Sequence, residues 1–195
     1  ASVFEHNRLD LLSLAGITAR LLGLVADGPL ATDTAREALA LGRVYERAGH
    51  WERAEQSYER AVDLASAAGQ AGRSGFASPG GSTAIRLDAL RALALGARRR
   101  RRWNEAAARW RQVLDVPGCP VQLRREATEA LAIHHEHRDR DLAAAKLFAL
   151  KSLEAGSEVA WGDAVRHRLA RIERKMVSER SLFPSSPLPP SCGSP

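Results

Sequence analysis

Apolar residues recur with helical spacing over most of this chain. In residues 4–25 they come close to a period of 3.6, which is typical of one face of a helix. These positions are Leu9, Leu12, Leu14, Ile17, Leu21, Leu22 and Val25. The sequence "DGP" at 27–29 ends the pattern, since glycine and proline both interrupt helices. We therefore predict an amphipathic helix over residues 4–25.

Similar patterns predict three helical hairpins and a final helix further along the chain. The hairpins cover roughly residues 35–67, 83–116 and 121–155, and Thr34 with Glu37 predicts a capping box at the first of them. The final helix, 158–179, carries an apolar face made of Val159, Trp161, Val165, Leu169, Ile172 and Met176. A Gly/Ser-rich insertion at 69–83 predicts a flexible loop. The Pro/Ser-rich residues 180–195 predict a disordered tail.

Composition supports an all-α fold. The chain is 45% hydrophobic but only 5% aromatic, and it is rich in Ala, Leu, Arg and Glu, which are strong helix formers.

Cys119 and Cys192 are the only cysteines, so we expect no structural disulfide and a cytoplasmic location. We judge no apolar stretch long enough to span a membrane and expect no membrane partner. The chain starts at Ala1 rather than at a methionine, which we interpret as a sign of a fragment.

The net charge of +6 raises the possibility of an anionic partner. One basic run stands next to Trp103, and it consists of Arg98, Arg99, Arg100, Arg101 and Arg102. Such a run could contact a phosphate backbone. It could also be a solvated helix end, where cations interact favourably with the helix dipole. We favour the solvated end, and a weak nucleic-acid contact stays open.

A cluster of histidines and carboxylates, "HHEHRDRD", spans residues 134–141. His134 and His137 are three residues apart on a predicted helix, and Asp139 and Asp141 follow. A helical metal site would prefer two ligands four residues apart and a third ligand in space. We therefore interpret this cluster as structural or as part of the surface.

The first hairpin resembles a tetratricopeptide (TPR) repeat. Eight positions agree with the repeat pattern: Leu41, Gly42, Tyr45, Gly49, Trp51, Ala54, Tyr58 and Ala61. Aligning the hairpins on the alanine of the second helix pairs Ala54 with Ala106 and Ala144. The resemblance implies a solenoid over residues 32–179, with the last helix as a cap and a concave face that binds a protein or peptide.

Two further segments resemble bacterial RNase H-like exonucleases of the DEDD superfamily that bear a C-terminal TPR region. These segments are "FEHNRLDLLSLAGITARLL" at 4–22 and "EALAIHHEHRDRDLAAA" at 129–145. The resemblance implies that residues 1–27 contain the last helix of a truncated nuclease domain. It also implies that Asp10 binds Mg²⁺ or Mn²⁺ and that His6 helps to activate the attacking water. His6 and Asp10 are four positions apart, so they share one face of a helix.

The other acidic residues of that superfamily would precede this segment. One carboxylate cannot hold two metal ions, so we expect this chain alone to bind no cofactor and to have no nuclease activity. Two other hypotheses remain open. The chain could be a non-enzymatic TPR adaptor with His6 and Asp10 as surface residues, or its basic repeats could bind nucleic acid in their own right.

Overall fold

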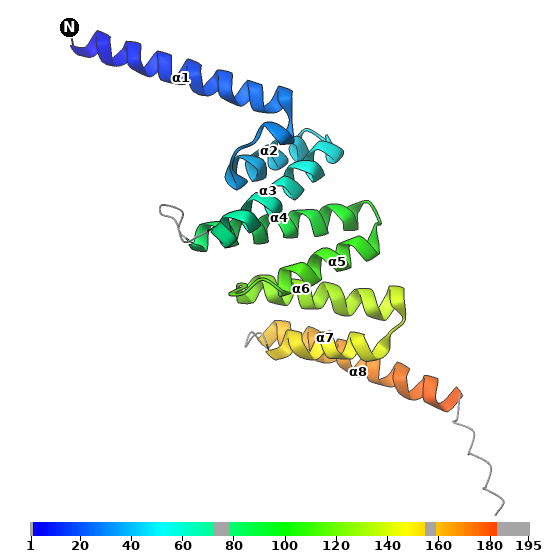
Figure 1. Cartoon of the computed structure of the whole chain (residues 1–195). Helices are drawn as coiled ribbons and strands as arrows, with labels where there is room; N and C mark the ends of the chain where they lie inside the picture. The colour runs from blue at the N-terminus through cyan, green and yellow to red at the C-terminus, as the bar shows by residue number, and fades with distance from the viewer. Residues whose placement is uncertain (1, 72–78, 155–158, 183–195) are drawn as a thin grey trace, which may run out of the picture. The chain divides into compact units, whose positions relative to one another are not determined.

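The computed structural model describes residues 2–71, 79–154 and 159–182, and these residues form helices without any strand (Figure 1). The expected all-α class is therefore confirmed, with consecutive helices packed as pairs in the manner of a TPR-like solenoid. The elements are α1 (Ser2–Asp27), the 3-10 turn η1 (Pro29–Ala31), α2 (Ala35–Arg47), α3 (Trp51–Ala71), α4 (Pro79–Arg99), α5 (Trp103–Leu114), α6 (Val121–His134), the π-helical turn η2 (His135–Asp139), α7 (Leu142–Glu154) and α8 (Val159–Leu182).

The chain divides into two compact units between Cys119 and Pro120. The first unit contains α1 to α5, and the second contains α6 to α8. This division lies inside the region that the sequence predicts as one repeat domain. The predicted domain limits of 1–27, 32–179 and 180–195 stay predictions.

The first hairpin begins with the predicted capping box. The Thr34 hydroxyl accepts a hydrogen bond from the Glu37 amide at 3.2 Å, and the Glu37 carboxylate accepts one from the Thr34 amide at 3.2 Å. Two free amides at the helix start are thereby satisfied. Small residues then let α2 and α3 approach closely, since Ala38 and Ala61 are fully buried.

The turns inside the three hairpins share one backbone feature, a residue with positive φ. These residues are Gly49 (φ 79°), Arg101 (φ 60°) and Arg140 (φ 55°). After α2, the Gly49 amide donates to the Glu46 carbonyl and the His50 amide to the Tyr45 carbonyl. After α4, the amides of residues 101 and 102 donate to carbonyls 98 and 97 in the same pattern. Both helices thus end in a Schellman motif, which usually requires glycine.

The third hairpin is in a register one residue later than the alignment predicts. Its second helix starts at Leu142, and the first two start at Trp51 and Trp103, so the equivalent of Ala54 and Ala106 is Ala145. Ala145 is fully buried, whereas Ala144 is only partly buried. The alignment on Ala144 is one residue off because Phe148, whose ring is half-buried, places an aromatic residue four positions after Ala144, which is the spacing that the alignment expects. In the structure this ring stacks on His135, with 5.4 Å between the ring centroids.

Helix α8 covers the third hairpin with the predicted apolar face. Val165, Leu169 and Ile172 are buried, and Met176 packs against the cluster of Leu142, Ala145 and Ile172. The side chains of Val159 and Trp161 lie outside the described residues.

Two predicted irregular segments are shorter than expected. Within the insertion 69–83, helix α3 continues to Ala71 and α4 already begins at Pro79, while residues 72–78 lie outside the described part. Helix α8 likewise extends to Leu182, and the rest of the predicted tail is outside the described residues.

Helix α1 begins and ends close to its predicted limits, but its side chains pack against little else. Among the large apolar residues from Phe4 onward, only Leu24 is buried, while Leu12, Ile17 and Leu21 are 57–59% exposed. The segment Phe4–Asp27 is long and apolar enough to cross a membrane, by length and composition alone. The sequence-based judgement that no stretch meets this criterion was therefore wrong, because Asp10 and Arg20 interrupt the run without making it too polar.

Candidate functional site

Helix α1 places His6 and Asp10 side by side. The His6 Nε2 atom lies 3.5 Å from the Asp10 Oδ2 atom, and the two side chains are 76% and 66% exposed. The pair therefore has the predicted geometry, but in open solvent its electrostatic interaction is weak. Among the described residues, no three histidine, cysteine or acidic side chains lie together in a way that could hold a metal ion.

The last turns of α1 are attached to the first hairpin by polar contacts. The Arg20 guanidinium lies 3.0 Å from the Asp33 carboxylate and 3.4 Å from that of Glu37. The Tyr45 hydroxyl donates to the Val25 carbonyl at 2.7 Å. Within the described residues, the preceding turns of α1, which carry His6 and Asp10, have no such attachment.

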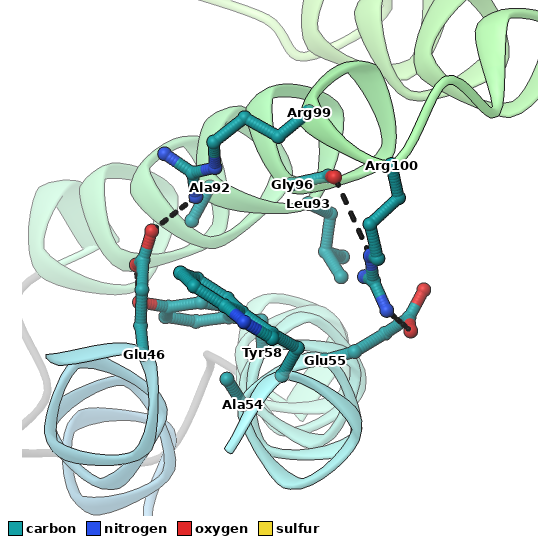
Figure 2. Close-up of a pocket in the computed structure, with 10 residues that line it drawn as sticks. Glu46, Ala54, Glu55, Tyr58, Ala92, Leu93, Gly96, Arg99 and Arg100 are labelled. Atoms are coloured by element: carbon teal, nitrogen blue, oxygen red, sulfur yellow. Dashed lines mark hydrogen bonds and ion pairs between the residues drawn. The ribbon is translucent and has the colours of Figure 1, made fainter. Parts of the chain in front are cut away.

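Most of the arginine run holds the second hairpin to the first. Arg99 pairs with Glu46 of α2, and Arg100 lies 2.8 Å from Glu55 of α3 (Figure 2). Arg102 lies 2.5 Å from Glu55 as well. Arg98 and Arg101 are exposed. Three of the five arginines are therefore engaged by glutamates, and our interpretation of a merely solvated helix end does not describe them.

Glu55 is a shared acceptor with little exposure to water. Burial alone would raise its pKa, but hydrogen bonds from Arg102 and Arg100 outweigh burial and lower the pKa of this carboxyl. The ionised form is therefore the stable form where the two hairpins meet.

An aromatic and ionic cluster adjoins Glu55. The Tyr58 hydroxyl donates to Glu46 Oε2 at 2.6 Å, and the Arg99 guanidinium lies over the Trp51 ring, 5.4 Å from its centroid. Burial and the Glu46 hydrogen bond raise the pKa of Tyr58 well above its ordinary value. Figure 2 shows these side chains gathered around a small hollow between α2, α3 and α4. The hollow, about 10 Å³, has room for about one water molecule.

The solvent-facing side of α2 and α4 forms a separate surface, which we call the α2/α4 face. Its positions are spaced three or four residues apart on each helix. They are Arg36, Ala40, Arg43 and Arg47 on α2, and Ala84, Asp88, Arg91, Leu95 and Arg98 on α4. Arg43 lies 2.9 Å from Asp88, so the two rows of side chains are adjacent. Sequence reasoning missed this face because its arginines, apart from Arg98, are scattered singly rather than in a run.

The histidine cluster surrounds a buried ion pair that the sequence analysis did not identify. The Glu136 side chain is fully buried and accepts hydrogen bonds from Arg171 at 2.9 and 2.7 Å and from Lys175 at 2.7 Å. His134 and His135 both contact the Asp139 carboxylate, at 3.3 and 2.9 Å. The structural interpretation fits these contacts, although the partners on α8 lie too far along the chain for spacing to indicate them.

A comparison with known protein families matches the first hairpin. The family model of the tetratricopeptide repeat matches residues 38–71, which cover most of α2 and all of α3. No curated protein matches the chain at a significant level. The matched segment contains the small and aromatic residues that bring α2 and α3 together, including Gly42, Tyr45 and Tyr58. This chain is therefore a TPR-containing protein, and its repeat supports a protein-binding scaffold role.

Proposed function

We propose that this chain is the C-terminal part of a metal-dependent RNase H-like exonuclease, in which the repeats form the scaffold that binds a protein partner or positions the substrate strand. The observation that carries the proposal is the solvent-exposed apolar surface of α1. Nine of its large apolar side chains are exposed: Phe4, Leu9, Leu11, Leu12, Leu14, Ile17, Leu21, Leu22 and Val25. A helix that is apolar on all sides is normally buried in a protein core or in a membrane.

A protein domain fits this helix better than a bilayer. The last turns of α1 are tied to the first hairpin through Arg20 and Tyr45. The whole segment Phe4–Asp27 is long and apolar enough to cross a membrane, but this attachment engages its last turns. The mainly apolar stretch that is left before Arg20 runs from Leu9 to Ala19, about 16 Å at 1.5 Å per residue. A membrane span needs about 20 apolar residues. A nuclease domain that packs around this stretch would bury it and would supply the remaining acidic residues.

The chemistry of the proposed site follows from the two exposed polar residues on α1. The Asp10 carboxylate is a hard oxygen ligand of the kind that Mg²⁺ and Mn²⁺ prefer. His6 lies one helical turn away, and an imidazole is a common general base. The resemblance to the DEDD exonucleases assigns the same roles. This chain by itself is expected to be inactive because it offers only one carboxylate at this place.

The test uses the complete gene product. The coding sequence upstream of Ala1 should encode a strand with an Asp-x-Glu pair, and the purified protein should shorten end-labelled single-stranded DNA or RNA with Mn²⁺ or Mg²⁺. Asp10→Asn should reduce the rate to the level seen with EDTA. His6→Ala should lower kcat by about 10²-fold, as expected when a general base is removed.

The matched control is Glu5→Gln, which removes a charge from the same exposed turns of α1 and should leave the rate unchanged. The proposal fails if the upstream sequence lacks the acidic strand. It also fails if the complete protein degrades neither nucleic acid, or if Asp10→Asn and Glu5→Gln behave alike.

A TPR adaptor without a nuclease domain is the second candidate. The observation that favours it is the set of contacts between α1 and the first hairpin, from Arg20 to Asp33 and from Tyr45 to Val25. These contacts make α1 an N-terminal extension of the repeats. The adaptor predicts that the complete gene product retains a peptide partner, yet neither Mn²⁺ nor Mg²⁺ gives it nuclease activity.

A further inference from the structure

The α2/α4 face differs in charge from the opposite side of the first unit. Its charged positions are five arginines and one aspartate. By comparison, the exposed residues of α3 carry both signs of charge, since they include Glu52, Arg53, Gln56 and Asp63. Positive charge in the first unit is therefore concentrated on the side chains of α2 and α4 rather than spread evenly.

The face carries more arginines than its own carboxylate can pair. Asp88 is the one carboxylate among the nine positions, and it pairs with Arg43 at 2.9 Å. Within the part of the chain that the structure describes, Arg36, Arg47 and Arg98 form no ion pair. By contrast, Arg99, Arg100 and Arg102 are engaged by glutamates between the hairpins. The Arg43–Asp88 pair also shows that an arginine of this face can hold a carboxylate.

The uncharged positions of the face favour a peptide over a nucleic acid. They are the aliphatic residues Ala40, Ala84 and Leu95, and Val44 lies next to them with 39% exposure. None of them offers the aromatic ring on which the bases of a single strand stack. Small aliphatic side chains between cations suit a ligand that alternates carboxylates with apolar side chains.

We propose that the α2/α4 face binds an extended acidic peptide segment of a partner protein. Arg36 and Arg47 are eleven residues apart on one face of α2, a span of about 16 Å. A strand rises about 3.3 Å per residue, so about five residues of an extended peptide reach from one arginine to the other. Arg98 meets a carboxylate from the α4 side, and Val44 and Leu95 contact the apolar side chains between them. The proposal deepens the scaffold part of the proposed function and does not depend on the nuclease part.

The experiment measures fluorescence anisotropy with this chain and a labelled twelve-residue peptide of repeated Glu-Leu-Glu-Ala. We expect binding that weakens as NaCl rises from 50 to 300 mM, because exposed charge pairs are screened. The variant Arg36→Gln/Arg47→Gln/Arg98→Gln should weaken binding about tenfold, since each exposed charge contact is worth a factor of a few. Glutamine is uncharged and has a helix propensity close to that of arginine, and circular dichroism checks that the variant is folded.

The matched control is Arg8→Gln/Arg101→Gln/Arg174→Gln, which removes the same charge from exposed positions elsewhere. It should bind the peptide as the unchanged chain does, and a Lys-Leu-Lys-Ala peptide should not bind. The proposal is overturned if the acidic peptide does not bind, or if both triple variants lose affinity equally. Binding of a labelled oligothymidine that is lost only in the first variant, without peptide binding, would assign the face to nucleic acid instead. None of these outcomes depends on the result of a nuclease assay on the complete protein, so the two proposals can fail separately.

Discussion

Gly42 of α2 lies directly against the ring of Tyr58 of α3. A Cβ atom at Gly42 would stand 2.6 Å from both the Cδ1 and the Cε1 atoms of that ring. Tyr58 cannot easily move away, because it is buried and its hydroxyl donates to Glu46. The absence of a side chain at Gly42 therefore sets how closely the two helices of the first hairpin approach.

Gly42→Ala should destabilise the first unit. Alanine gains about 1 kcal/mol in helix propensity, but the contact with Tyr58 forces the helices apart or the ring out of place, which typically costs 1–3 kcal/mol and loses packing as well. We expect a net loss of about 1 kcal/mol or more in urea unfolding. Gly96→Ala is the control, since its Cβ would make only an ordinary contact, 3.7 Å from Arg100. Equal stability of both variants would contradict the role of Gly42.

Arg101→Gly should stabilise the protein, because a non-glycine residue at positive φ costs about 1 kcal/mol. Arg101 occupies the turn position that Gly49 occupies in the first hairpin. The reverse change, Gly49→Ala, should destabilise by about 1 kcal/mol, although no atom lies within 4 Å of its Cβ. Thermal unfolding of the two variants measures both effects. A stabilised Gly49→Ala variant would be inconsistent with the shared turn geometry.

The hairpins could be predicted from the sequence because their signals are local. The capping box of Thr34 and Glu37, the small residue Gly42 and the turn residue Gly49 each act within one or two helical turns. The register of the third hairpin could not be predicted, because Phe148 offers the expected aromatic one position away from its structural equivalent. The stacking of Phe148 on His135 depends on the π-helical turn, for which the sequence has no simple signal.

Of the candidate sites, too, some could be predicted from the sequence and some could not. The His6–Asp10 pair could be predicted because one helix holds both residues. The pairing of Arg100 and Arg102 with Glu55 could not, because it joins residues about 45 positions apart across two hairpins. A run of like charges carries no information about the opposite charges that the fold brings to it.

Glu55→Gln should loosen the second hairpin from the first. Glutamine keeps the shape of the side chain but loses the charge that Arg100 and Arg102 share, and a hydrogen bond to a charged group contributes about 1.5–3 kcal/mol. We expect urea unfolding to show a loss of about 2 kcal/mol. Amide exchange should accelerate in α4 and α5. Glu52→Gln on the exposed side of α3 is the control and should change little. A stability equal to that of the control would mean that Glu55 does not hold the hairpins together.

Glu136 should make the stability of the second unit depend on pH. Burial raises the pKa of this carboxyl, but hydrogen bonds from Arg171 and Lys175 outweigh burial and lower the pKa from 4.5 to about 2. Because the folded-state pKa is the lower one, the carboxylate stabilises the fold above about pH 4.5. That contribution, roughly 3 kcal/mol at neutral pH, is lost as the pH falls from about 4.5 to about 2.

Glu136→Gln should therefore destabilise α6 to α8 by roughly 3 kcal/mol at pH 7, and the difference from the unchanged chain should shrink between pH 4.5 and pH 2. Amide exchange of these helices in increasing urea measures this change in the free energy of unfolding for the second unit alone. Glu173→Gln is the matched control, because its carboxylate is 54% exposed and pairs with Lys146 at 2.8 Å. Exposed pairs contribute about 0.5 kcal/mol, so this control should stay near the unchanged chain at every pH. A Glu136→Gln difference that persists at pH 2 would show that lost packing, rather than lost charge, causes the effect.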